Sequence, residues 1–138
     1  DGGQIILDYN LKEIDYGVME GKTFEYLSKN FKDMIESWKR KEDLRFPNGE
    51  NTGDVFGRLS KFINKLKNTE GNSIVCTHNV VIRCLIGSNF NIPMHEWHKL
   101  IIDYLDPMEV IITDNNVYMN LSKEQKENIF KKIGYYNN

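Results

Sequence analysis

The sequence is poor in the features that mark secreted, membrane-spanning or nucleic-acid-binding chains. Only two of its 138 residues are cysteine, Cys76 and Cys84, and no secretory leader or apolar run of about 18 residues is evident. The net charge is −2, so the chain lacks the concentrated basic surplus that nucleic acids and anionic membranes require. We therefore expect a cytoplasmic protein with reduced cysteines, and no nucleic acid or membrane among its partners.

No repeat, low-complexity stretch or linker divides the chain, which predicts a single globular domain. Apolar residues at helical spacing predict helices over 23–39, capped by Thr23, over 55–66 and 80–88, and from Ser122 onward. Runs rich in β-branched residues predict strands over 4–8 and 73–77 and a hairpin that joins 108–113 to 117–121. Alternating strands and helices favour an α/β fold, a three-layer α/β/α sandwich with a mostly parallel sheet.

One predicted strand stops at polar residues. The run from Ile74 to Thr77 is followed by His78 and Asn79, and an apolar helix begins directly after them. In α/β proteins this position is the carboxyl edge of the sheet, where ligands bind. A lone histidine at such an edge is more often structural than catalytic, so further residues have to support a site.

Three strings carry the most specific information. The first runs from Leu11 to Gly17 and continues to Glu20-Gly21, the second is Pro47-Asn48-Gly49-Glu50-Asn51 with Asp54 and Arg58, and the third runs from Thr77 to Arg83. Taken singly, Glu13 is an exposed loop acid and Glu50 a turn residue. In this order and at these separations, the three strings resemble the histidine phosphatase (phosphoglycerate mutase-like) superfamily over essentially the whole chain.

The resemblance implies phosphoryl transfer to a histidine and then to water, with no cofactor and no metal. Glu13 would protonate the leaving oxygen and later act as the base for water. His78 would donate a hydrogen bond to the transferring oxygens, where negative charge must be stabilised. The remaining residues that the resemblance assigns to substrate binding are Asn79, Arg83, Glu50 and Thr77.

The sequence departs from the family pattern in two places. Asn79 stands where glycine is commonest, and asparagine tolerates the same backbone turn. The arginine-histidine-glycine triplet that supplies the nucleophile is absent, as is the downstream arginine that holds the phosphate. We therefore expect residues 1–138 to be the C-terminal part of a single histidine phosphatase domain. The nucleophile would lie upstream, and the fragment alone would be inactive.

The substrate is constrained only to a small phosphorylated metabolite. The short stretch between Glu20 and Gly49 favours a phosphatase over a mutase, which would carry a long insert there. The strings also resemble the bisphosphatase half of the bifunctional fructose-2,6-bisphosphate enzyme. However, Phe46 and Asn48 replace a tyrosine and a lysine of that branch. A broad phosphomonoesterase similar to α-ribazole phosphatase is an equal alternative, and a homodimer is left open.

Three other classes of protein remain as alternatives. The missing nucleophile is compatible with a non-catalytic pseudophosphatase or phosphate-binding module. It is also compatible with half of a split or domain-swapped enzyme. A metal hydrolase is disfavoured, because His95 and His98 are three residues apart and lack a matching acid or histidine partner.

Overall fold

The computed structural model describes residues 4–134 and is mainly helical. Its helices are α1 (Phe24–Asn30), α2 (Lys32–Lys39), α3 (Thr52–Leu66), α4 (Asn79–Asn89) and α5 (Lys123–Ile129). Short 3-10 turns are η1 (Tyr9–Leu11), η2 (Gly17–Met19) and η3 (Met94–Lys99), and the strands are β1 (Glu109–Ile112) and β2 (Val117–Asn120). No helix within residues 4–134 is both long and apolar enough to cross a membrane.

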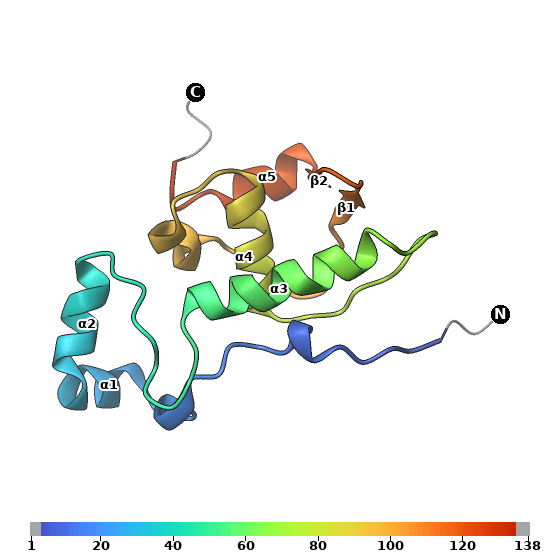
Figure 1. Cartoon of the computed structure of the whole chain (residues 1–138). Coiled ribbons are helices and arrows are strands. Elements are labelled where there is room, and N and C mark those ends of the chain that lie inside the picture. The colour runs from blue at the N-terminus through green and yellow to red at the C-terminus, as the bar shows by residue number, and fades with distance from the viewer. Residues whose placement is uncertain (1–3, 135–138) are drawn as a thin grey trace.

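The core is built around α4, which lies between α3 and α5 (Figure 1), and includes buried residues of all three helices. The apolar spacing of the α3 sequence puts Val55 and Leu59 on one face, and both are buried. Helix α4 is apolar on several sides, as expected of a helix covered by neighbours. Trp97 of η3 packs directly on Gly87 of α4, where a Cβ atom would collide with the indole ring.

Polar side chains fix where the helices begin. Asn51 and Asp54 form a capping box at the start of α3, and Ser122 forms one with Gln125 at the start of α5. The carboxylate of Asp43 also accepts hydrogen bonds from the Thr52 and Gly53 amides. The predicted helix start at Ser122 is thus confirmed, and the helix predicted over 55–66 begins earlier, at Thr52.

The helix predicted over 23–39 is wrong as one element. Thr23 caps it as predicted, but Phe31, with φ −130° and ψ 47°, separates α1 from α2. The Asn30 side chain donates to the Tyr26 carbonyl and satisfies one of the last acceptors of α1. Helix α2 then begins as a separate element at Lys32 and buries Met34 and Ser37.

The strands predicted over 4–8 and 73–77 are not formed. Both segments are extended, but the hairpin of β1 and β2 is the only sheet among residues 4–134. Ile5, Leu7 and Ile74 are 87%, 90% and 96% exposed. A β-branched run becomes a strand only when a neighbour takes up its backbone hydrogen bonds, and the described residues supply none to these segments. The predicted hairpin is confirmed, with Glu109 opposite Asn120, whereas the described part shows no three-layer sandwich.

The two cysteines have different surroundings. Cys84 is fully buried in α4, and burial raises the pKa of its thiol to about 12, so it is part of the apolar core. Cys76 is exposed in the extended segment that precedes α4. Cys84 therefore packs as a small apolar residue, whereas Cys76 is accessible to solvent.

Candidate active site

The first two sequence strings meet backbone to backbone. Glu50 N donates to the Asp15 carbonyl at 2.8 Å, and Val18 N donates to the Pro47 carbonyl at 3.0 Å. Gly17 has φ +55°, and a Cβ atom there would overlap the Pro47 carbonyl. A Cβ atom at Gly49 would overlap the Asp15 carbonyl in the same way. Glycine is required at both positions because two loops cross in contact, and this crossing fixes the loop that carries Glu13.

Arg58 of α3 binds this loop from the other side. Its Nε and one terminal nitrogen donate to the two carboxylate oxygens of Glu50 at 3.0 and 3.1 Å. The terminal nitrogens also donate to the backbone carbonyls of Asn10, Lys12 and Glu13. The side chains of Arg58 and Glu50 are only 11% and 17% exposed. Burial opposes ionisation of Glu50, but Arg58 and the Asp15 amide outweigh it and hold the pKa of the carboxyl below its usual range.

The Glu13 carboxylate lies at the N-terminus of α4. Val80 N is 3.2 Å from Oε1 and 3.3 Å from Oε2, and Ile14 N donates to Oε1 at 2.9 Å. The first amides of a helix have no partner within the helix, so the Val80 amide is available to donate to the Glu13 side chain. The structure thus brings Glu13 to the residues that directly follow His78.

His78 occupies the N-cap position of α4, with extended backbone angles and an exposed side chain. Its carbonyl accepts from Ile82 N at 3.0 Å, and Asn79 is the first residue of the helix. Among residues 4–134, no hydrogen bond engages the imidazole ring, and the side chain is exposed to solvent. The predicted position of His78 at a sheet edge is not seen, because segment 73–77 is unpaired.

Thr77 and Glu50 are engaged with the protein itself. The Thr77 hydroxyl donates to the Leu11 carbonyl at 2.7 Å and so joins segment 73–77 to the loop of Glu13. Both oxygens of Glu50 are taken by Arg58, and one of them also accepts from Asp15 N. In this structure, both predicted substrate-binding residues therefore hold the loop in place.

Arg83 lies one turn into α4, close to Glu13 and Tyr16. Its Nε donates to the Leu100 carbonyl at 2.9 Å, while no hydrogen bond within the described residues involves its terminal nitrogens. Burial lowers the pKa of Arg83; the Tyr16 phenolate, when it forms, and the Glu13 carboxylate act in the opposite direction. Burial and the Glu13 charge raise the pKa of Tyr16, whose ring packs edge-on against Phe46 at 4.9 Å. Tyr16 therefore stays a neutral phenol beside the acid and the arginine.

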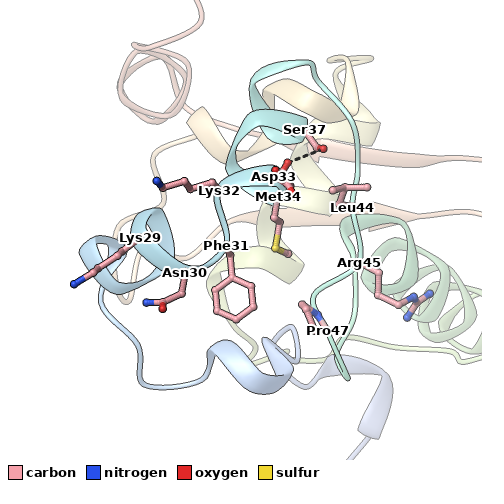
Figure 2. Close-up of a pocket in the computed structure, with 10 residues that line it drawn as sticks. All are labelled: Lys29, Asn30, Phe31, Lys32, Asp33, Met34, Ser37, Leu44, Arg45 and Pro47. Carbon is pink, nitrogen blue, oxygen red and sulfur yellow. Dashed lines mark hydrogen bonds between the residues drawn. The ribbon is translucent and has the colours of Figure 1, made fainter.

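A separate hollow of about 630 Å³ opens between α1, α2 and the loop 44–47 (Figure 2). Phe31, Met34 and Pro47 form its apolar floor, and Lys29 and Lys32 stand at its edge. None of Glu13, His78, Asn79 and Arg83 lines this hollow. It is open and shallow, and it is not the site that the three strings define.

The described residues contain no group of three histidine, cysteine, aspartate or glutamate side chains arranged to hold a metal. His95 lies 3.3 Å from Glu96, which is also paired with Lys99, and burial of Trp97 anchors this turn. His95 therefore contacts a surface carboxylate that is already paired with Lys99, His98 is exposed, and the metal-hydrolase alternative gains no support.

Sequence reasoning missed Arg58 and Tyr16. Arg58 was part of the second string, four residues after Asp54, but received no role of its own. The spacing of the string was the only available signal, because the partners of Arg58 near Glu13 are about 45 positions away along the chain. Tyr16 carried no signal beyond its place in the first string.

Comparison with known proteins agrees with this geometry. The family model of the histidine phosphatase superfamily (branch 1) matches residues 1–124. The chain belongs to the histidine phosphatase superfamily, whose members share an α/β, phosphoglycerate mutase-like fold. The resemblance drawn from the three strings is thereby confirmed.

Individual relatives point to two branches of this enzyme family. A fructose-2,6-bisphosphatase of Saccharomyces cerevisiae is 31% identical over 72% of this chain and 22% of its own length. A 6-phosphofructo-2-kinase/fructose-2,6-bisphosphatase of Arabidopsis thaliana is 36% identical over 62% of this chain and 12% of its own length. A probable phosphoglycerate mutase GpmB of Enterobacter sp. is 30% identical over 72% of this chain and 47% of its own length. The chain thus spans less than half the length of these relatives.

Proposed function

We propose that the intact protein hydrolyses small phosphate monoesters through a phosphohistidine intermediate. The observation that carries the proposal is the Glu13 carboxylate at the N-terminus of α4, directly after His78. An acid and an exposed imidazole thus lie at the start of α4, one turn before Arg83, whose terminal nitrogens make no hydrogen bond within the described residues. That combination suits a phosphoryl group with a leaving oxygen that needs a proton.

In the first chemical step, a histidine nitrogen attacks phosphorus and the bond from phosphorus to the ester oxygen breaks. Glu13, as the carboxylic acid, gives its proton to the departing oxygen. In the second step, water attacks phosphorus, the phosphorus–nitrogen bond breaks, and the Glu13 carboxylate takes the proton from water. His78, Asn79 and Arg83 hold the equatorial oxygens through both steps, because negative charge accumulates there.

The nucleophile is proposed to lie in a part of the protein that precedes this chain. The 138 residues contain no arginine-histidine-glycine triplet, and the chain spans less than half of its relatives. The exposed, extended segments 4–8 and 73–77 support the same proposal, since each has backbone groups free to pair with further strands. With such strands added, we expect the three-layer sandwich with a mostly parallel sheet, and His78 at its carboxyl edge.

The substrate is proposed to be a small phosphorylated metabolite such as a sugar phosphate. This rests on the relatives named as fructose-2,6-bisphosphatases and as a probable phosphoglycerate mutase. The short connection between Glu20 and Gly49 favours hydrolysis over mutase chemistry.

The test is hydrolysis of p-nitrophenyl phosphate and of sugar phosphates in EDTA. The samples are the intact protein, its His78→Ala and Glu13→Gln variants, and the 138-residue chain alone. We expect activity without metal in the intact protein, losses in both variants, and no activity in the isolated chain. A requirement for a divalent metal, or equal turnover by the isolated chain, would contradict the proposal.

A second candidate is a non-catalytic phosphate-binding module, favoured by the absence of the nucleophile triplet from the sequence. It predicts that the intact protein binds a phosphate ester without turning it over. Calorimetric binding of a sugar phosphate, together with the assay above, separates the two candidates.

A further inference from the structure

Arg58 has an unusual set of partners for an arginine on a helix. It donates to one carboxylate, that of Glu50, and to three backbone carbonyls within the four residues that end at Glu13. Asn10 lies in the single 3-10 turn η1, and Lys12 and Glu13 follow it in a segment without regular secondary structure. The guanidinium therefore joins the end of this turn to the irregular segment and restrains the backbone up to Glu13.

Glu50 extends this restraint to the far side of Glu13. Its carboxylate accepts from Asp15 N at 3.0 Å, and its own amide donates to the Asp15 carbonyl at 2.8 Å. The backbone is thus held at residues 10–13 by Arg58 and at residue 15 by Glu50. Glu13 lies between the two restraints, and its side chain reaches Val80 N from there.

We propose that Arg58, paired with Glu50, is the positioning residue that holds the Glu13 carboxylate at the N-terminus of α4. The inference rests on the proposed role of Glu13 as proton donor. Arg58 contacts the main chain of Glu13 and acts on the reaction only through that residue. A lysine cannot replace it, because one ammonium cannot serve two carboxylate oxygens and three carbonyls in a planar fork.

The experiment compares two substrates that differ in their need for a proton donor. p-Nitrophenolate leaves without a proton, whereas the alkoxide of an alkyl phosphate needs one. We would measure kcat/KM for both substrates in the intact protein, because this quantity reports the steps up to the departure of the leaving group. The variants are Arg58→Lys and Glu13→Gln.

Glu13→Gln should lower kcat/KM on the alkyl phosphate by about 10²- to 10⁴-fold, and much less on p-nitrophenyl phosphate. Arg58→Lys should show the same selectivity with a smaller loss, about 10- to 100-fold, because a displaced proton donor is less damaging than an absent one. Equal losses of Arg58→Lys on both substrates would overturn the inference. If Glu13→Gln itself lacks the selectivity, the proposed role of Glu13 fails, which is a separate outcome.

Two further variants guard against an effect of folding or of charge. Arg40 makes a similar forked pair with Glu42 on the exposed surface, so Arg40→Lys is the matched control and should leave both values of kcat/KM unchanged. If Arg58→Lys does not fold, Glu50→Gln takes its place, since it weakens the same restraint while conserving size. A selective loss on the alkyl phosphate in Glu50→Gln supports the inference, and equal losses contradict it.

Discussion

Around α3 and α4 the chain is held by buried contacts, whereas the α1–α2 pair stands to one side of the molecule (Figure 1). The described residues of α1 include no buried side chain, and Phe24 is 70% exposed. Trp38 of α2 reaches the rest of the chain through an edge-on contact with Phe46 at 5.4 Å. Substitutions should therefore have different effects in the two regions. The candidate site depends on the first region, and ring contacts from Trp38 to Phe46 and from Phe46 to Tyr16 link it to the second.

The largest expected difference between the two regions is the loss of stability when a phenylalanine of each is replaced by alanine. Phe130 is 1% exposed and packs against Phe90, whereas Phe24 lies on the surface of α1. Phe130→Ala should lower the free energy of unfolding of the intact protein by about 4 kcal/mol, and Phe24→Ala by less than about 0.5 kcal/mol. Urea titration followed by circular dichroism measures both. Equal effects would show that α1 is as firmly packed as the core.

The next largest difference in stability is expected between a buried and an exposed ion pair of arginine with glutamate. Arg58→Met leaves Glu50 largely buried without its partner, which should cost about 3 kcal/mol of unfolding free energy. Arg40→Met removes a fully solvated pair with Glu42 and should not shift the urea midpoint measurably. A small effect of Arg58→Met would mean that water replaces the guanidinium at the loop of Glu13.

Alanine substitutions at two glycines with positive φ distinguish the effect of steric crowding on stability from that of backbone strain. Gly17 has φ +55° and faces the Pro47 carbonyl, whereas Gly21 has φ +68° and no described atom near its missing Cβ. Gly21→Ala should therefore lower the free energy of unfolding by about 1 kcal/mol through backbone strain alone. Gly17→Ala should cost about 3 kcal/mol, because the crossing loops must also separate. Similar losses in the two variants would show that the loops move apart easily.

The sequence predicted what neighbouring residues determine. The spacing of Val55 and Leu59 indicated α3, and the helix starts at Thr23 and Ser122 were confirmed, because these signals act over a few residues. The break at Phe31 was not predicted, since the apolar period continues through it.

Pairing between segments that are distant along the chain was harder to predict from the sequence. The β-branched residues near Ile5 and Ile74 indicated strands, but a strand needs a partner, and the hydrogen bonds that would form one are not found among residues 4–134. The role of Glu13 beside His78 was expected only from the family resemblance, because no local pattern indicates its position. That position depends on Arg58 and Val80, which lie far along the chain.

The smallest predicted effect is on the pH dependence of stability under acidic conditions. The pKa of Glu50 is below its ordinary value in the folded protein, so its contribution to stability is complete above the ordinary glutamate pKa and is lost as pH falls through the lowered one. Glu50→Gln should therefore flatten the loss of unfolding free energy between about pH 5 and pH 3. Glu70→Gln, at an exposed loop position, is the matched control and should leave the slope unchanged.

The central claim is that Glu13 and α4 belong to a site that forms and hydrolyses phosphohistidine. The most direct measurement is rapid quenching of the intact protein with a ³²P-labelled phosphate ester in EDTA. We predict a phosphoenzyme that is stable in alkali and labile in acid, and that persists longer in Glu13→Gln than in the wild type. Hydrolysis of the ester without such a phosphoenzyme, or a phosphoenzyme that decays equally fast in Glu13→Gln, would contradict the claim.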